Sequence, residues 1–535
     1  MNNRLELKRN LSQLLENSHL KPVLYNSALT LAQFIALQKL SKFSNQIVPV
    51  SGKKIIIHSV HGTYLRAIYK EGALALALRL NGNDAKMLFC DQRISSCCAL
   101  FTIDHPASKR DCHNCVRFSK RFCSLLNIPH LSYNDFTVPE DRLEQFLSVG
   151  NVYPEGKHNP ESILYKGVHI GRHAETGTQR YFKGQQTSKE VYHKHFISKL
   201  MDASIVVNIA ERVLLEEKPD TIITSHSCYA EFGPFSEFFK NAGIPVFTWF
   251  TGYEPNTLVF DLPEVGKNFD KWSERWSTYF TEYTAKPVLE EFIKKRKSGM
   301  GESTLYGFTQ SVKVFDFVDD FSFIYGLFPN SPWDADPSCH PLFFDSISDW
   351  VEETIQFFIK HPLLFLIVKT HPSESLYKSK LTIHDLIVSK FPDLPKNILL
   401  LPPNTEISAY DLFRHLDVGI VSNSTTGLEM LLDNTPCITV GEAHYRSRGF
   451  TYDPKTKKEY FNLLEREHYE MFNKEELWLY AYYYFIKSFM PFNVFYRKNM
   501  FDIGFTFKNL NELKEDENIK HIVDCITNGK LFQDW

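Results

Sequence analysis

The sequence predicts an α/β protein of two Rossmann-like domains, whose parallel sheets face a cleft, with a helical extension at the N-terminus. Short apolar runs rich in β-branched residues alternate with helical patterns along the chain, and this order is typical of parallel sheets. The alternation is interrupted by a basic, polar stretch at residues 294–301 and then restarts. A chain of 535 residues is also too long for a single hydrophobic core.

The first domain is expected over residues 49–300. Its apolar runs end at polar or turn residues, which is the pattern of buried parallel strands. The expected strands are residues 54–62, 85–90, 220–226 and 244–250, and the expected helices are residues 69–80 and 235–241. Before this domain, residues 1–48 carry Leu and Ile at helical spacing and form the expected extension.

The second domain is expected over residues 301–490, after an exposed linker at residues 294–301. Its expected strands are residues 321–328, 365–369, 398–401 and 418–421, and its expected helices are residues 349–358, 409–415 and 475–490. The last of these helices is aromatic nearly all round and lacks the basic face of a membrane-surface helix, so we expect it in the core. Residues 491–535 are expected to pack back on the domains.

Composition and charge exclude several classes of protein. Hydrophobic residues make up 43% of the chain and charged residues 23%, which is ordinary for a globular protein. A formal net charge of −3 gives no indication of nucleic-acid binding. No stretch is apolar enough to cross a bilayer, and the charged N-terminus is not followed by the apolar run of a secretory signal. We therefore expect a cytoplasmic protein.

Two polar motifs in the second domain come directly after predicted strands. The first is Lys369-Thr-His371-Pro372, and the second is Ser424-Thr425-Thr426-Gly427, which leads into a helical pattern. The carboxyl ends of parallel strands form the ligand-binding edge of an open α/β sheet. A helix start adds free N–H groups and a partial positive charge, which suit a phosphate.

These motifs and two neighbouring segments carry a family resemblance. The segments are residues 328–334, 369–372, 422–429 and 441–453. The second half resembles the bacterial capsular polysaccharide biosynthesis family, which includes β-Kdo transferases, and its motifs are similar to those of bacterial polysialyltransferases. The resemblance covers roughly residues 320–490 and implies glycosyltransferases of GT-B architecture.

The resemblance implies a donor site for a nucleotide-activated sugar. In the similar transferases these motifs hold the nucleotide and phosphate of a CMP-sugar. Carried over, His371 would assist departure of the phosphate, and Ser424 and Thr425 would hold it. Glu429 would bind a ribose hydroxyl. The other residues carried over to the donor site are Lys369, Pro372, Thr426, Gly427, His444, Arg446 and Asp334.

Structural alternatives exist for most of these residues. His371 can equally be bonded to a loop at the end of its strand, and Ser424–Thr426 can serve only as the N-cap that such a helix requires. Arg446 can belong to a solvated loop. Asp334-Ala-Asp336 resembles an Asp-x-Asp metal motif, but after Pro332 it is better explained as a turn. We expect no metal and no cofactor at the donor site.

A general base for the acceptor hydroxyl is expected from the first domain. The candidates in its predicted strand-end loops are His58, His61, His173, Glu175, His226 and Glu254. The sequence does not choose among them, and we select Glu175 as the candidate catalytic carboxylate.

A cysteine cluster follows the second predicted strand. Cys112-His113-Asn-Cys115 has metal-ligand spacing, and Cys98 lies nearby. A second Cys-x-x-Cys pair is missing, so ordinary reduced thiols are the simpler interpretation. If Cys98, Cys112 and Cys115 bind a structural metal, the fourth ligand would be Cys90, Cys97, His113 or Cys123.

The sequence and the resemblance together predict a glycosyltransferase of capsule or surface polysaccharide biosynthesis. Its donor would be nucleotide-activated, with CMP expected, and its acceptor a glycan or glycolipid. The alternatives are a CDP-polyol phosphotransferase of the same fold and a non-catalytic glycan-binding or export-coupling protein. Peripheral contact with the inner membrane or with the capsule export machinery is left open, and nucleic acid is not expected as a partner.

Overall fold

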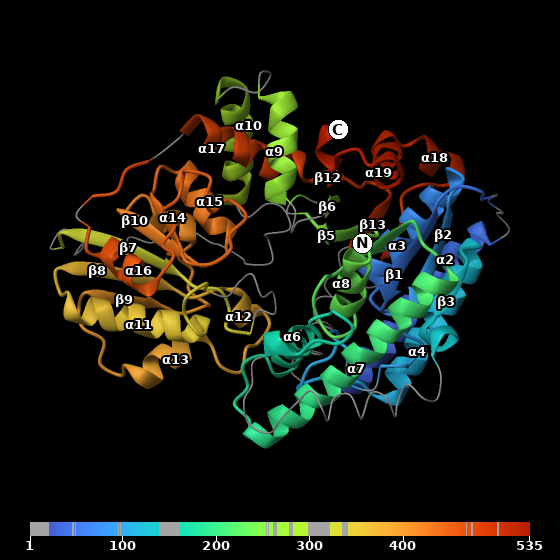
Figure 1. The fold of residues 1–535 in the computed structure, drawn as a ribbon, viewed down its shortest axis with the longest axis horizontal. Helices are drawn as coiled ribbons and strands as arrows, with labels where there is room; N and C mark the ends of the chain where they lie inside the picture. The colour runs from blue at the N-terminus through green and yellow to red at the C-terminus, as the bar shows by residue number, and fades with distance from the viewer. Residues whose placement is uncertain are drawn as a thin grey trace, which may run out of the picture.

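A computed structural model describes most of the chain in atomic detail. The described residues are 21–44, 48, 50–94, 96, 98–137, 160–252, 254, 256–260, 265–277, 282–297, 321–333, 341–466, 468–471, 474–499 and 502–535. They form a seven-stranded sheet, a five-stranded sheet and a two-stranded hairpin. Each larger sheet has helices on both faces, and the two units lie side by side (Figure 1).

The first sheet has the strand order β12-β6-β5-β4-β1-β2-β3. Its strands are β1 (Lys54–Val60), β2 (Asp84–Phe89), β3 (His130–Ser132), β4 (Thr221–Thr224), β5 (Val246–Thr251), β6 (Thr257–Phe260) and β12 (Met490–Pro491). The central strands are parallel, whereas β6 and β12 pair antiparallel at one edge. Long connections join β1 to β2 and β2 to β3, as the parallel pairing of these strands requires.

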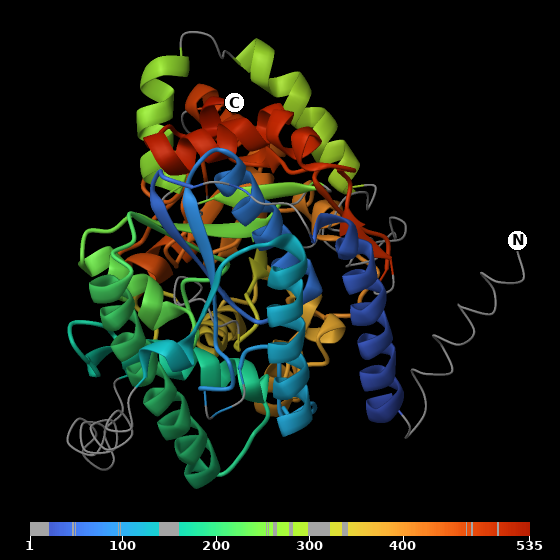
Figure 2. The ribbon, with the colours of Figure 1, turned by 90° about the vertical axis from the view of Figure 1, so that its right-hand side faces the viewer.

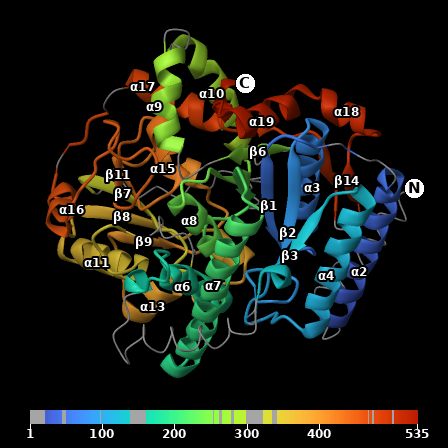
Figure 3. The same ribbon diagram turned by 45° about the vertical axis from the view of Figure 1, so that its right-hand side comes forward.

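Alternating side chains of β1 bury both faces of this sheet. Ile55 and Ile57 pack on one side, while Ile56 packs on the other. The first side is covered by α2 (Lys21–Leu40), α3 (Leu65–Leu80), α4 (Lys109–Leu126), α18 (Leu510–Glu515) and α19 (Glu517–Asn528). The second side is covered by α7 (Lys189–Glu216) and α8 (Gly233–Asn241). Figure 3 shows α7 in front of the sheet and α3 behind it.

The second sheet is entirely parallel, in the order β11-β10-β7-β8-β9. Its strands are β7 (Phe323–Phe328), β8 (Leu364–Lys369), β9 (Ile398–Leu401), β10 (Val418–Val421) and β11 (Cys437–Thr439). One face packs on α11 (Ile347–Lys360), α13 (Ile383–Lys390) and α16 (Lys457–Leu464). The other face packs on α14 (Ala409–Phe413), α15 (Thr425–Leu432) and α17 (Lys474–Tyr482).

Two helices between the sheets belong to the second core. α9 (Val265–Trp276) and α10 (Glu282–Lys297) place Phe269, Trp272 and Phe292 in one hydrophobic cluster with α15 and α17. Residues 294–297 of the expected exposed linker form the last turn of α10, although three of the four are exposed. Arg296 in that turn is half-buried and forms an ion pair. The remainder of the linker lies outside the described residues.

The C-terminal segment returns to the first unit. After α17 the chain makes a π-helical turn over Tyr483–Lys487 and then adds β12 to the first sheet. The hairpin of β13 (Phe495–Arg497) and β14 (Ile503–Phe505) follows, and then α18 and α19 join the core around α3. Figure 2 shows these C-terminal helices lying across the first sheet. The short 3-10 turns are Ser41–Phe43, Tyr133–Phe136, Pro160–Ser162 and Phe532–Asp534.

The predicted fold class is confirmed. Two Rossmann-like units with parallel sheets pack side by side, which is the GT-B-like arrangement. Among the described residues, no helix combines the length and apolar character that crossing a bilayer would require.

Candidate functional site

The two units meet through segments that follow strand ends. α6 (Ile170–Phe182) of the first unit and α12 (Ser373–Leu376), which directly follows β8, both lie between the sheets (Figure 1). Lys183, just after α6, donates through Nζ to the carbonyl of Tyr377 at 3.2 Å, and its own carbonyl accepts the N–H of Lys380 at 3.0 Å. Lys380 Nζ also lies 2.6 Å from Asp104. The carboxyl edge of the second sheet therefore faces the first unit.

His371 follows β8 and is held by the start of α12. The backbone N–H of Ser373 donates to His371 Nδ1 at 3.1 Å, and the Ser373 hydroxyl lies 2.6 Å from the same atom. Because Nδ1 accepts from a backbone donor, the proton of the neutral ring is on Nε2. Burial, together with the charge of Lys369, lowers the pKa of His371 to about 4. The ring is therefore a neutral donor through Nε2 at physiological pH.

Lys369 is a buried cation beside this histidine. The residue is only 5% exposed, and burial lowers its pKa to about 8. Within the part of the chain that the structure describes, no side chain or carbonyl makes a hydrogen bond or ion pair with its ammonium group. A buried ammonium without a counter-ion is costly and attracts an anion. An anion at the end of β8 would compensate this charge.

Ser424 begins α15 at the end of β10. Its Oγ accepts the backbone N–H of Thr426 at 3.2 Å, as an N-cap does. Gly427 in the first turn is required by packing, since a Cβ there would lie 2.2 Å from the Tyr445 hydroxyl. Ser424, Thr425 and Thr426 are half-buried. The N-cap interpretation is thus correct for Ser424, and it is compatible with an anion at the same helix start.

The structure links the His-Pro and Ser-Thr motifs through the loop after β7. This loop lies between the other two because β7 separates β8 from β10 in the sheet. Ser331 Oγ is 3.0 Å from Ser373 Oγ, and Asn330 Nδ2 donates to the carbonyl of Asn423 at 3.0 Å. Asn423 directly precedes Ser424. The two motifs therefore occupy one continuous polar edge of the second sheet.

Glu429 does not belong to that edge. Its carboxylate is 5% exposed and lies 2.8 Å from Nη2 of Arg296 on α10. Tyr410 is a further hydrogen-bond partner of this carboxylate, and burial raises its pKa. The carboxylate joins α15 to α10, and the expected contact between Glu429 and a ribose hydroxyl stays a prediction.

Arg446 and His444 are also engaged within the protein. The guanidinium of Arg446 donates to the carbonyls of Thr439 and Pro454, so it shapes its own loop rather than contacting an anion. His444 stacks on Tyr484 with ring centroids 4.0 Å apart, and its Nδ1 is 2.7 Å from the Tyr480 hydroxyl. Tyr445, between these two residues, donates to the carbonyl of Ser424, so their loop lies beside the start of α15, and their role in the donor site stays a prediction. Asp334 lies outside the described residues.

Glu175 is on α6, on the first-unit side of the cleft. Its Oε1 accepts the hydroxyl of Tyr192 at 2.6 Å and the side-chain amide of Gln179 at 3.2 Å. The other candidate bases are held in the first core or in its loops. His58 stacks on Phe235, His173 is bonded to Glu237, and His226 to Ser225.

A groove of about 870 Å³ opens between the units beside these residues. The first unit contributes residues of and after α6, and the second unit contributes Trp333 and the start of α13. Its polar and aromatic lining includes Gln179, Gln185, Gln186, Tyr192, His193 and Trp333. Sequence reasoning missed this groove. The sequence feature that could have indicated the groove is the turn at Lys183 and Gly184, which both have positive φ.

Comparison with known proteins agrees with the resemblance. Residues 340–488 match the model of a family described as capsule polysaccharide biosynthesis protein. This segment contains His371, Ser424 and the loop after Gly441. No curated protein matches the chain.

Distant similarity to solved structures is also found. The β-Kdo 2,4 transferase of Thermosulfurimonas dismutans KpsC is 14% identical, with a TM-score of 0.35, over 56% of this chain and 88% of that chain. The β-Kdo 2,7 transferase of the same protein is 14% identical, with a TM-score of 0.30, over 51% and 78%. The UDP-GlcNAc 2-epimerase of Methanocaldococcus jannaschii is 13% identical, with a TM-score of 0.25, over 78% and 95%.

The matched segment begins before α11 and ends at the π-helical turn, and it carries both polar motifs of the second sheet. Over this segment the chain is similar to the capsule polysaccharide biosynthesis protein family.

Proposed function

We propose that the protein is a glycosyltransferase of capsule or surface polysaccharide biosynthesis. It transfers a sugar from a nucleotide-activated donor, bound by the second unit, to a glycan or glycolipid acceptor. The observation that carries this proposal is the polar edge of the second sheet. There a buried lysine lies two residues before a histidine, and contacts through the loop after β7 link that histidine to a helix start.

The donor phosphate binds at this edge. Lys369 supplies a positive charge that no described group neutralises, and His371 supplies an Nε2–H donor whose direction is fixed by Ser373. The first turn of α15 adds backbone N–H groups at the positive end of the helix dipole. The choice of CMP over other nucleotides rests on the resemblance of the motifs.

The same groups serve the chemical step. Cleavage of the bond between sugar and phosphate leaves an extra negative charge on the departing phosphate oxygen. Fixed donors stabilise that charge more in the transition state than in the ground state, and so they accelerate the reaction. The neutral ring of His371 donates a hydrogen bond from Nε2 to the leaving oxygen and keeps its proton. We propose that this donor site needs no divalent metal.

The acceptor binds in the groove between the units. Amide side chains and aromatic rings line this groove, and both suit the hydroxyl groups and apolar faces of sugars. Glu175 is our candidate for the base that receives the acceptor proton. Its carboxylate is bonded to Tyr192, which lines the groove, so the proton path passes beside this tyrosine. Contact with the inner membrane or with export machinery rests on the resemblance alone.

Nucleotide binding tests the proposal against its rivals. Thermal shift of the full chain with CMP, CDP, UDP and GDP should give the largest stabilisation with CMP. The largest shift with CDP would favour a polyol phosphotransferase instead. No shift with any nucleotide would favour a non-catalytic glycan-binding protein.

Two variants connect binding to the site. Lys369→Met should abolish the shift, whereas Lys360→Met, at the exposed end of α11, should retain it. Transfer from a CMP-sugar to a glycan acceptor, followed by release of CMP, then tests the reaction. If Lys369→Met retains the shift, the nucleotide binds elsewhere.

A further inference from the structure

Three loops at the carboxyl edge of the first sheet bring together a histidine, a cysteine and a glutamate. His61 follows β1, Cys98 lies in the loop after β2, and Glu231 lies in the loop after β4. These strands are neighbours, in the order β4-β1-β2. One ligand-type atom from each residue lies within 4.8 Å of the others. The three residues are far apart in the sequence, and the fold brings them together.

Two members of this group are buried, and Cys98 is half-buried. Glu231 is fully buried and His61 is 5% exposed. Glu231 Oε1 accepts the backbone N–H of Ala99 at 2.5 Å. Within the described residues, however, neither His61 Nε2 nor Glu231 Oε2 has a hydrogen-bond partner, and His61 Nε2 lies 3.5 Å from Glu231 Oε1. Buried polar atoms are nearly always paired, so these two point to a ligand between the loops.

The chemistry of the group identifies that ligand. Imidazole nitrogen, thiolate sulfur and carboxylate oxygen are the atoms that bind Zn²⁺ in proteins. A neutral histidine with one thiolate and one carboxylate carries two negative charges, which match a divalent cation. Lys199 is the buried cation near both acids in the structure, and a single ammonium balances only one of those charges.

We propose that His61, Cys98 and Glu231 bind a zinc ion. Tetrahedral zinc ligands lie about 3.3–3.8 Å from one another, at Zn–N and Zn–S distances of about 2.0 and 2.3 Å. Atoms within 4.8 Å reach this geometry with small side-chain movements. The Ala99 N–H orients the carboxylate from behind, as outer hydrogen bonds do in metal sites.

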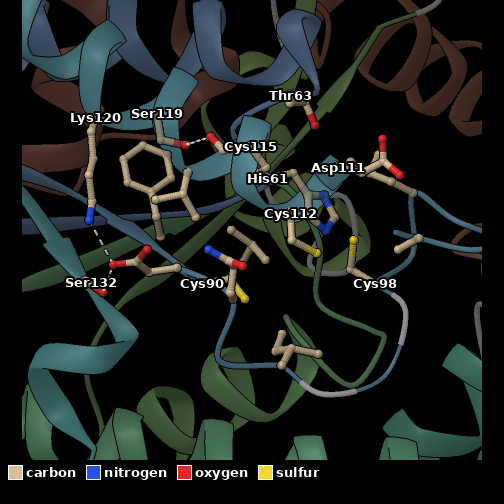
Figure 4. A pocket seen from close by; sticks show the side chains of 18 of the residues that line it. His61, Thr63, Cys90, Cys98, Asp111, Cys112, Cys115, Ser119, Lys120 and Ser132 are labelled. Atoms are coloured by element: carbon tan, nitrogen blue, oxygen red, sulfur yellow. Dashed lines mark hydrogen bonds and ion pairs between the residues drawn. The ribbon is translucent and has the colours of Figure 1, made fainter. Parts of the chain in front are cut away.

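The fourth coordination position faces a cavity. Figure 4 shows His61, Cys98 and Cys112 on the same side of it, and Cys90 and Cys115 also line it. Cys115 is not assigned as a ligand, because its Sγ accepts the backbone N–H of Gly62 at 3.1 Å. Cys123 contacts Met87 in the core. The set of Cys98, Cys112 and Cys115, which the spacing offers as an alternative to ordinary thiols, shares only Cys98 with this group.

Metal analysis of the full chain tests this site. Protein produced with zinc in the medium and purified without chelator should contain about one equivalent of zinc. Cys98→Ser and Glu231→Gln should each lower the content at least fivefold. Cys115→Ser, in the same cavity, and Glu237→Gln, on helix α8 that follows the Glu231 loop, are matched controls that should retain the zinc.

A second measurement does not depend on how the variants fold. Wild-type protein loaded with Co²⁺ in place of zinc should show the absorption of a tetrahedral cobalt–thiolate site, and Cys115→Ser should show it too. Less than about a tenth of an equivalent of any transition metal in the wild type would overturn the proposal. Loss of the metal in Cys115→Ser, or its retention in Cys98→Ser, would also overturn it.

Discussion

The backbone N–H of Ser373 lies 3.1 Å from Nδ1 of His371 and donates to it. This contact decides which ring nitrogen carries the proton, and so it decides that Nε2 is the donor. A side chain at the end of a strand is thereby oriented by the helix that follows it.

Loss of His371 should impair turnover far more than binding. His371→Ala should lower kcat by roughly 10²–10⁴, which is the usual effect of removing a positioned acid or donor. The dissociation constant of the nucleotide should change much less. Transfer kinetics and nucleotide titration of the same preparation separate the two effects. His415→Ala, at a half-exposed histidine of the same unit, is the control. An unchanged kcat in His371→Ala would exclude the leaving-group role.

Loss of the N-cap of α15 should impair nucleotide binding rather than turnover. Ser424→Ala removes the hydroxyl that accepts the Thr426 N–H. It should weaken nucleotide binding by about three- to tenfold, because an N-cap or a single hydrogen bond contributes about 1 kcal/mol. Isothermal titration measures the change. Ser408→Ala removes a comparable cap from α14, away from the motifs. It should leave the affinity unaltered, and a matching loss there would indicate general destabilisation.

The affinity for nucleotide should depend on pH through Lys369. Burial lowers the pKa of this lysine to about 8, and a bound phosphate raises it by favouring the charged form. Binding therefore takes up a proton above about pH 8, and affinity should fall up to tenfold per pH unit there. Below pH 7 the lysine is charged in both states and the dependence should vanish. Titrations at pH 6.5, 7.5, 8.5 and 9.0 test this.

The Lys369→Arg variant provides the comparison. Arginine stays charged over the whole range, so any nucleotide binding that the variant retains should lose the decline above pH 8. A decline that persists in Lys369→Arg would assign it to another group.

Glu374 should make the protein less stable at alkaline pH. This carboxyl group is 1% exposed, accepts the N–H of Ile383, and has its pKa raised to about 8 by burial. The folded state thus holds a proton that the unfolded state releases above its ordinary pKa near 4.5. Its contribution to stability is present below that pH and is lost as the pH rises through about 8.

The isosteric Glu374→Gln variant removes this titration. At pH 8 it should be about 1–3 kcal/mol more stable than the wild type, and at pH 4.5 the difference should be small. Urea unfolding at the two pH values measures both quantities. Equal differences at the two pH values would show that Glu374 does not hold a proton in the folded state.

The strands were predictable from the sequence because a strand that is buried on both faces has a continuous run of apolar residues. The β1, β8 and β10 runs are apolar and β-branched, and their polar ends mark the binding edge. The 28-residue helix α7 was missed, since it is buried along much of its length and lacks a polar face of regular period.

Site residues were predictable only where their partners are local. His371 and Ser424 are positioned by residues two places further along the chain, and such contacts follow from strand-end and N-cap rules. Glu429 and Arg446 resemble ligands for a sugar or phosphate, but Glu429 is engaged by a distant residue and Arg446 by two carbonyls of its own loop. The partner of Glu429 is Arg296, which the sequence placed in a solvated linker. The grouping of His61, Cys98 and Glu231 likewise depends on strand order, which no local pattern specifies.

The pairing of β12 with β6 has a consequence for how the cleft can move. The chain leaves the first sheet after β6 and returns to it at β12, and Met490 pairs with Leu258 where the two passages run side by side. Two covalent crossings at one place oppose sliding and twisting between the units. Rotation about an axis through these crossings remains, and it opens or narrows the groove on the far side. A chain ending before residue 488 would lose one of the crossings, and it would also leave β6 as an unpaired edge strand.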